Sequence, residues 1–302
     1  MKSKDLRKVV MRMTDDGISS RQIAKELRNV VKQRFTYKRR RSARQLAKSV
    51  RVSEATMRRV IQDDPHLHAY HVTIQPNIQD DHKQRRKSFA YWVRKSLRKK
   101  DHGLILFTDE KYFGMDGIYN RQNDRVYASS PQEVDGHGGI HRLSKFPKRI
   151  MVWLGACKEG LTAPIIFKPG DTLTHKNYID IVLPHALAEG QRLLGEDFIY
   201  QQDNATPHTH KDSLTWIRNN FSRFIDETKW PPNSPDLSVL DYYVWDAINH
   251  NIHWEKVKNY NSLIEEIKQG VSRVPSTSVV RSVETWPSRI SSILRTNGDY
   301  IR

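Results

Sequence analysis

The sequence predicts an α/β domain with a mixed sheet, preceded by a small all-helical region, and three observations support this prediction. Short apolar runs of the kind that form buried strands begin at residue 103. Amphipathic segments with helical spacing alternate with these runs toward the C-terminus, as in sheets that are flanked by helices. Residues 1–100 contain helical patterns and hold the excess positive charge of the chain.

The distribution of charge separates the two regions. Residues 1–100 hold 28 Lys and Arg against 9 Asp and Glu, whereas residues 101–302 hold 23 against 25. A basic module attached to a near-neutral domain is typical of proteins that bind nucleic acid. On charge alone, a solvated basic face or tail remains the alternative.

The composition also excludes several classes of protein. No run of about 18 apolar residues occurs, so we expect no membrane span. The N-terminus lacks the apolar segment of a secretory signal. The single cysteine, Cys157, excludes a disulfide framework and a cysteine-based zinc site. We therefore expect an intracellular protein.

Residues 1–64 are predicted to be a DNA-binding region of the helix-turn-helix type. Short helices are expected over 5–13 and 19–27, and a helix pair within 42–63 has Ser53 as the cap of its second helix. The residues expected to lie between the paired helices are Leu46, Ala47, Met57, Val60 and Ile61. The residues expected to contact DNA are Arg44, Ser53, Thr56, Arg58 and Arg59.

The turn of this helix pair differs from the usual pattern. Arg51 stands where such turns usually have Gly, and a left-handed backbone there costs about 1 kcal/mol. An ordinary helical hairpin is therefore the alternative interpretation.

Residues 65–100 are predicted to be a basic linker followed by a basic helix. Phe89, Trp92 and Val93 share one face of that helix with Leu97. We expect this face to pack on the next domain; a helix that lies along a DNA backbone is the alternative.

Residues 101–302 are predicted to form one α/β domain. The expected strands are 104–108, 149–156, 163–167 and 198–202, with 125–128 as a further candidate. The expected helices are 178–194, 209–220 and 237–252, followed by two or three more.

Three acidic residues stand out by their position, and we call Asp109, Asp203 and Asp241 the aspartate trio. Asp109 and Asp203 each follow a predicted strand, at the place where α/β sheets gather ligands. Asp241 lies early in a predicted helix. A charge at a buried strand end is costly unless it is paired or bound to a metal. A lone aspartate is more often a helix cap or an ion-pair partner.

The chemistry of three carboxylates suits a hard divalent cation. Mg²⁺ takes a few carboxylate oxygens and keeps other positions for water and phosphate oxygens. Two such ions about 4 Å apart stabilise both the attacking and the leaving oxygen in phosphodiester cleavage.

The segments around the trio resemble motifs of one protein family. The segments are Phe107–Lys111, Gln202–His208 and Pro232–Trp245, with Trp153, Gly155 and Gly298–Tyr300 in addition. Together they are similar to the mariner superfamily of transposases, over roughly residues 80–302. There are 37 residues between the second and third acids, a spacing that resembles an all-aspartate branch of that family.

The resemblance implies a ribonuclease-H-like catalytic domain in which the aspartate trio is catalytic and holds two Mg²⁺ ions, for which Mn²⁺ can substitute. It implies a DNA transposase: activated water would cleave a phosphodiester at the transposon end, and the freed 3′ hydroxyl would attack target DNA. The implied partners are double-stranded DNA, both inverted repeats and target, and a second copy in a homodimer. The implied location is the nucleus.

The neighbours of the trio have several candidate roles. Asp236 is the rival third acid, but it follows Ser-Pro and is expected to cap the helix. Glu110 is not expected to be a ligand, because neighbours on a strand face opposite ways. Asn204 and His208 are candidates for supporting the acids, with packing or capping as the alternative for His208. His210 has no assigned role.

The N-terminal third departs from the family. Relatives have two helix-turn-helix units, whereas the first unit here lacks a recognition helix before the basic segment. We expect an incomplete reader, as after an internal deletion. Two alternatives follow: a transposase-derived DNA-binding protein without activity, and a nuclease that uses the same site without strand transfer.

Overall fold

A computed structural model describes residues 43–50, 53–62, 76–115 and 148–301, together with Gly17, Gln22 and Lys25. The chain divides into two compact units, residues 1–74 and 75–302. Within the described ranges, no helix is long and apolar enough to cross a membrane. The predicted helix over 5–13, the turn at Arg51 and the candidate strand over 125–128 lie outside the described residues. Of the predicted helix over 19–27, only Gln22 and Lys25 are described, and both are helical.

The first unit contains the predicted helix pair, α3 (Ala43–Val50) and α4 (Glu54–Gln62). Ala47 and Met57 are buried between the helices, as their spacing predicted. The Ser53 hydroxyl accepts a hydrogen bond from the Thr56 backbone N–H at 3.0 Å, which confirms Ser53 as the cap of α4. The pair thus has the buried face and the cap that the sequence indicated.

The outer face of the pair carries charge. Arg44, Thr56 and the two arginines of α4, Arg58 and Arg59, are exposed. Glu54 pairs with Arg44 at 2.9 Å and with Arg58 at 2.7 Å. Exposed ion pairs of this kind are weak, so both guanidinium groups can exchange this partner for a phosphate.

The second unit is built around one mixed sheet with the order β3-β2-β1-β5-β6, and β4 pairs with β2. The strands are β1 (Ile105–Gly114), β2 (Arg149–Cys157), β3 (Gly160–Leu161), β4 (Ile165–Ile166), β5 (Ile199–Gln201) and β6 (Arg223–Phe224). The helices before β6 are α5 (Asp80–Ser96), η1 (Asp101–Leu104), α7 (His175–Asn177), η2 (Tyr178–Val182), α8 (Leu183–Leu194) and α9 (Lys211–Asn220). The later ones are η3 (Pro235–Leu237), η4 (Leu240–Val244), α10 (Trp245–Asn251), η5 (Trp254–Lys256), α11 (Tyr260–Arg273), α12 (Ser276–Glu284) and α13 (Trp286–Arg295).

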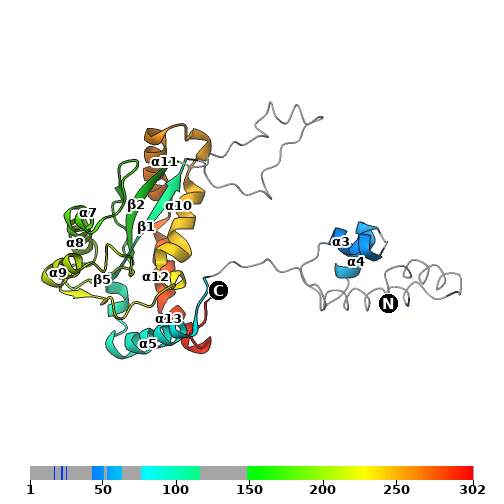
Figure 1. Cartoon of the computed structure of the whole chain (residues 1–302), viewed down its shortest axis with the longest axis horizontal. Helices are drawn as coiled ribbons and strands as arrows, with labels where there is room; N and C mark the ends of the chain where they lie inside the picture. Colours follow the sequence, from blue (N-terminus) through cyan, green and yellow to red (C-terminus); the bar gives the residue numbers. More distant parts are fainter. Residues whose placement is uncertain are drawn as a thin grey trace. The chain divides into compact units, whose positions relative to one another are not determined.

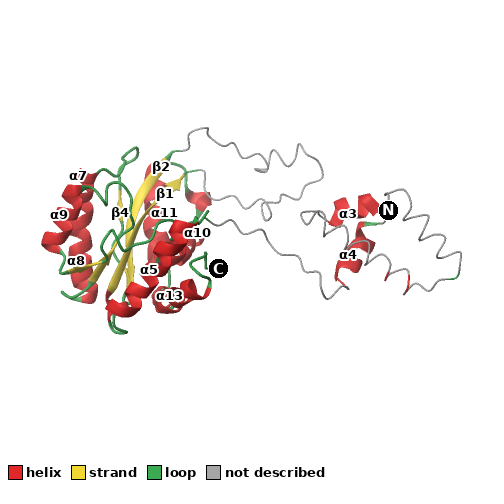
Figure 2. Cartoon of the chain, turned by 60° about the horizontal axis from the view of Figure 1, so that its bottom comes forward, coloured by secondary structure: helices red, strands yellow, loops and turns green. Residues whose placement is uncertain are grey.

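Helices cover both faces of the sheet. Figures 1 and 2 show α7, α8 and α9 on one side, and α5 with α10 to α13 on the other. Side chains alternate between these layers: Ile105 and Phe107 of β1 join the core under α10 to α13, whereas Leu106 joins the core under α8 and α9. The predicted mixed sheet flanked by helices is therefore confirmed.

Strand β1 is longer than the apolar run predicted. It continues past Asp109 to Gly114 because β2 pairs with it antiparallel from Phe107 to the end. Asp109 therefore lies in the middle of a strand and not at its end, which corrects the prediction. The polar residues 109–111 interrupt the apolar pattern, so hydrophobicity alone could not reveal the continuation.

Helix α5 packs into the second unit through the predicted face. Phe89 and Val93 are buried, and the Phe89 ring meets Trp230 edge-on with ring centroids 5.3 Å apart. The same helix also contributes a buried charge. Arg86 is fully buried and donates two hydrogen bonds to the Asp236 carboxylate, at 2.8 and 2.6 Å.

The Arg86–Asp236 ion pair joins three distant parts of the chain. Arg86 also donates to the Gly298 carbonyl at 2.9 Å, and the Ile301 N–H donates to the Asp236 carboxylate at 2.9 Å. Gly298 has φ +87°, and an added Cβ there would lie 2.4 Å from the Lys83 carbonyl oxygen. The C-terminal glycine motif is thus explained by close packing against α5.

Loss of the arginine should destabilise the fold. Arg86→Ala leaves the Asp236 carboxylate buried without its partner, so we expect the free energy of unfolding to fall by about 3–5 kcal/mol in urea denaturation. Arg94→Ala, which removes an exposed arginine of the same helix, should cost less than about 0.5 kcal/mol. Similar small losses for both variants would contradict the structural role of the buried pair.

Candidate active site

The aspartate trio borders a single cavity of about 460 Å³. The cavity walls also include Glu110, Gln201 and Asn204, and the loop from Trp230 to Pro235 forms another part. Asp203 follows Asp109 by 94 positions and precedes Asp241 by 38. All three residues nevertheless line the same cavity.

The pairing of β1 with β5 explains how the first two acids meet. The strands are parallel, with Ile105 opposite Ile199 and Phe107 opposite Gln201. Continuing this register by two residues places Asp109 beside Asp203. The parallel pairing therefore brings the two acids to the same place in the sheet, although β1 extends beyond Asp109 and β5 ends before Asp203.

The third acid comes from a helical segment with a local irregularity. Asp241 lies in η4, a π-helical turn that leads directly into α10. Such turns are rare and frequently mark functional sites. The carboxylate of Asp241 borders the cavity, whereas its backbone N–H is 3.5 Å from the Ser238 hydroxyl.

A tryptophan of α10 holds the Asp109 carboxylate. The indole N–H of Trp245 donates to Oδ2 of Asp109 at 2.6 Å, and Trp245 is buried. Because Trp245 follows Asp241 by four residues, both side chains lie on one side of the same helical segment. The third motif therefore supplies one acid and orients another.

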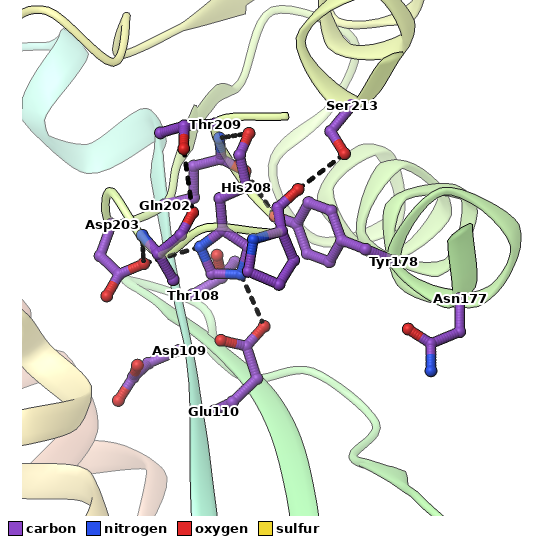
Figure 3. Close-up of polar contacts among 12 residues, drawn as sticks. Thr108, Asp109, Glu110, Asn177, Tyr178, Gln202, Asp203, His208, Thr209 and Ser213 are labelled. Carbon is purple, nitrogen blue, oxygen red and sulfur yellow. Dashed lines mark hydrogen bonds and ion pairs between the residues drawn. The ribbon is translucent and has the colours of Figure 1, made fainter. Parts of the chain in front are cut away.

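On the other side of Asp203, a histidine bridges two carboxylates (Figure 3). His208 Nδ1 lies 2.7 Å from Oδ1 of Asp203, and its Nε2 lies 3.3 Å from Oε1 of Glu110. The ring is buried and packs on Tyr178 with centroids 4.4 Å apart. Tyr178 is itself hydrogen bonded to Gln202 and to the Tyr200 hydroxyl. His208 is therefore fixed from several directions.

The pKa values reflect this arrangement. Burial alone would lower the pKa of His208, but the Glu110 charge and the hydrogen bonds to Asp203 and Glu110 raise it to about 10. The imidazolium in turn outweighs the effect of burial on Asp203 and lowers the pKa of that carboxyl. Asp203 is thus ionised, with about half of its side chain exposed at the cavity.

The other two acids of the trio behave in the opposite way. Burial and the charges of Asp241 and Glu110 raise the pKa of Asp109 well above its usual range, although the Trp245 N–H opposes the shift. Burial and the Asp203 charge raise the pKa of Asp241 to about 6, against opposing effects of Ser238 and Lys111. A cation between carboxylates that repel one another in this way stabilises their charged forms.

Two amide side chains add oxygen atoms to the same cavity wall. The side-chain oxygens of Gln201 and Asn204 are buried and have no hydrogen-bond partner among the described residues. Asn204 is oriented by its amide nitrogen, which donates to the Trp230 carbonyl at 2.9 Å. Carboxylate and amide oxygens are the donors that hard divalent cations take, so this wall suits such an ion.

The structure distinguishes Asp241 from Asp236, the other candidate for the third acid. Asp236 is buried in η3, and its carboxylate accepts from Arg86 and Ile301 without capping a helix, which corrects the expected role. Glu110 faces away from Asp109, as expected for strand neighbours, and yet it also borders the cavity. The DNA-contact candidates of α3 and α4 belong to the other unit.

Two residues that hold the acids or their histidine partner in place were not predicted from the sequence. Trp245 ends the third motif, and its spacing of four from Asp241 was the signal that could have identified it. No local pattern pointed to Glu110 as the partner of His208, because 98 residues separate them.

The chain is similar in sequence to known transposases. No protein-family model matches the chain. The Tcb2 transposase of Caenorhabditis briggsae is 25% identical over 251 residues, covering 80% of this chain and 85% of its own length. The Tc1 transposase of Caenorhabditis elegans is 23% identical over 257 residues, covering 82% and 86%.

A solved structure is similar over most of the chain. The mariner Mos1 paired end complex with Mg aligns with a TM-score of 0.70 at 18% identity, covering 90% of this chain and 78% of that chain. This likeness confirms the ribonuclease-H-like fold that the motifs implied.

Neutralising one acid should stabilise the protein. Because the pKa of Asp109 is raised in the folded protein, ionisation of this carboxyl destabilises the fold. The contribution of the protonated carboxyl to stability is present at low pH and is lost as the pH rises through the folded-state pKa. Asp109→Asn should therefore raise the midpoint of thermal unfolding in EDTA by several degrees at pH 7.5, and by much less at pH 4.5. Asp246→Asn, an exposed acid of α10, serves as the control. A lower midpoint for Asp109→Asn at pH 7.5 would show that the repulsion is not significant.

Proposed function

We propose that this chain, whose homologues are transposases of the Tc1/mariner family, is a DNA transposase of the cut-and-paste type. In this proposal it cleaves DNA at the ends of a transposon and joins the freed ends to target DNA. The observation that carries the proposal is the convergence of the aspartate trio, from β1, the end of β5 and η4, on one cavity.

We further propose that the aspartate trio holds divalent metal, with two Mg²⁺ ions as the working arrangement and Mn²⁺ as a substitute. Three features support this: the hard oxygen donors, the raised pKa of Asp109 and Asp241, and the two amide oxygens for which the described part of the chain offers no hydrogen-bond partner. Bound metal would supply Lewis acidity that stabilises charge on the attacking and leaving oxygens of a phosphodiester.

The surrounding side chains would position the acids. Trp245 fixes one oxygen of Asp109 and leaves the other free to bind a ligand. His208 holds one oxygen of Asp203 and, in its charged form, offsets part of the negative charge of the trio. Asn204 is anchored at Trp230 and lines the cavity. Hydrolysis and strand transfer are the same substitution at phosphorus, so one set of positioned acids serves both steps.

DNA binding and assembly would involve the helix pair and a second copy of the chain. The helix pair α3–α4 would contact transposon-end DNA through Arg44, Ser53 and Thr56 together with Arg58 and Arg59. A homodimer would pair the two ends, as the paired end complex of Mos1 indicates for that transposase. The place of action would be the nucleus, where the DNA substrate lies.

A plasmid assay tests the proposal directly. The full chain is incubated with Mg²⁺ or Mn²⁺ and a plasmid that carries the terminal repeats flanking its own gene. Excised fragments joined to a target plasmid would support a transposase. Nicks without joined products would indicate a nuclease, and binding without cleavage would indicate a DNA-binding relic.

The first variant for this assay is Asp203→Asn. Loss of one ligand charge should lower the cleavage rate at least about 100-fold, whereas DNA affinity should be unchanged, because binding resides in the other unit. Asp197→Asn, an exposed acid just before β5, is the matched control and should cleave normally. Parallel loss of cleavage and binding in Asp203→Asn would argue for misfolding instead of a catalytic role.

The helix pair can be tested through the salt dependence of binding. Arg58→Ala and Arg59→Ala should each weaken DNA binding several-fold and, for a phosphate contact, lower the slope of log affinity against log salt by about 1. Lys48→Ala, an exposed lysine of α3, removes the same charge outside the expected contact face. Unchanged affinity and slope in both arginine variants would remove α4 as the recognition helix.

A further inference from the structure

A cluster of side chains of the kinds that ligate metals lies outside the aspartate cavity. His175 is the first residue of α7, His210 caps α9, and Asp212 is the second residue of α9. One ligand atom from each of these three residues lies within 4.8 Å of the other two. We call His175, His210 and Asp212 the two-histidine cluster.

The two imidazole rings of the cluster are stacked face to face. His175 and His210 stack with centroids 3.8 Å apart and an interplanar angle of 14°. Nδ1 of His210 lies 3.7 Å from Oδ2 of Asp212. A tetrahedral ion with bonds of about 2.0–2.1 Å needs its ligand atoms about 3.4 Å apart. Turning the two stacked rings toward each other would bring the three ligand atoms onto one ion, with loss of the hydrogen bond that Nδ1 of His210 accepts from the Asp212 N–H at 3.3 Å.

The backbone on each side of the cluster is held by a capping box and by a buried ring contact. Thr174 and Asn177 form a capping box that sets the start of α7, where His175 stands. Tyr178 follows α7 immediately and packs on the ring of His208, two residues before His210. The two histidines thus project from segments that are locked together by another contact, which lowers the entropic cost of binding an ion between them.

The donor set selects the class of metal. Two imidazoles and one carboxylate are typical ligands of Zn²⁺ and neighbouring transition metals, whereas Mg²⁺ prefers oxygen ligands alone. The side chains are accessible, since His210 is 39% and Asp212 57% exposed. Lys176 and Lys211 adjoin the cluster in the sequence, and their charges oppose a cation, so the affinity should be moderate.

We propose that the two-histidine cluster is a Zn²⁺-class transition-metal site that links α7 to α9. Three protein ligands leave a fourth position to water, as in open zinc sites. An ion there would tie together the two segments that flank Tyr178 and His208. The site is independent of the aspartate cavity and of the proposed activity.

The test measures metal binding by full-length, tag-free protein treated with EDTA and then kept in millimolar Mg²⁺. The chain has 13 histidines, so the informative quantity is the difference between variants. Co²⁺ titration followed by visible absorption, with displacement by Zn²⁺, reports bound imidazole and carboxylate ligands. Thermal unfolding with and without Zn²⁺ gives a second readout, because binding to the folded state raises the midpoint.

The variants are His175→Ala and Asp212→Asn, with His250→Ala as the matched control. His250 is an exposed histidine beside an aspartate, Asp246, at 3.4 Å. Wild type and His250→Ala should each bind one more equivalent than His175→Ala, and Asp212→Asn should bind at least about tenfold more weakly. Far-UV circular dichroism verifies that all variants are folded. Equal binding and equal thermal shifts in wild type and His175→Ala would overturn the proposal.

Discussion

Carboxylates that repel one another must be held together by the rest of a fold, and the second unit is organised around such a group. The aspartate trio meets at one cavity in which burial and mutual repulsion raise the pKa of Asp109 and Asp241. The sheet provides the necessary restraint: β1 is paired on both sides, antiparallel to β2 and parallel to β5. Because a strand with two partners cannot move sideways, Asp109 and Asp203 remain neighbours despite their charges.

The third acid is held by contacts far from the cavity. Asp236, only five residues before Asp241, is fixed by the buried Arg86 of α5 and by the C-terminal Ile301. Both ends of the second unit thus secure the segment that leads to η4. The two aspartates of this motif have different roles: Asp236 pairs with the buried guanidinium of Arg86, whereas Asp241 lines the cavity.

His208 and Trp245 give the acids unequal environments. The imidazolium keeps Asp203 ionised, whereas Asp109 is half-buried and receives a hydrogen bond from a neutral donor, the Trp245 indole. A site in which the pKa of one carboxyl is lowered and the pKa of the other two is raised takes up protons more readily than three free aspartates would, and so carries less negative charge. A cation entering it would displace protons, so its affinity for the cavity depends on pH.

The sequence by itself determined the class of the fold, the buried face and cap of the helix pair, and the choice of three acids that the structure places around one cavity. These features are local, because apolar spacing, a capping serine and short motifs are each contained in a few consecutive residues. The resemblance carried by the motifs also pointed to the ribonuclease-H-like sheet, which the likeness to a solved transposase confirms.

Only the tertiary structure decided the length of β1, the tasks of Asp236 and Glu110, and the juxtaposition of His175 with His210. Each depends on partners that are distant in the sequence: β2 for the strand, Arg86 for Asp236, and His208 for Glu110. Pairing across such distances leaves no periodic trace in the chain, so hydrophobic patterns and motifs do not reveal it.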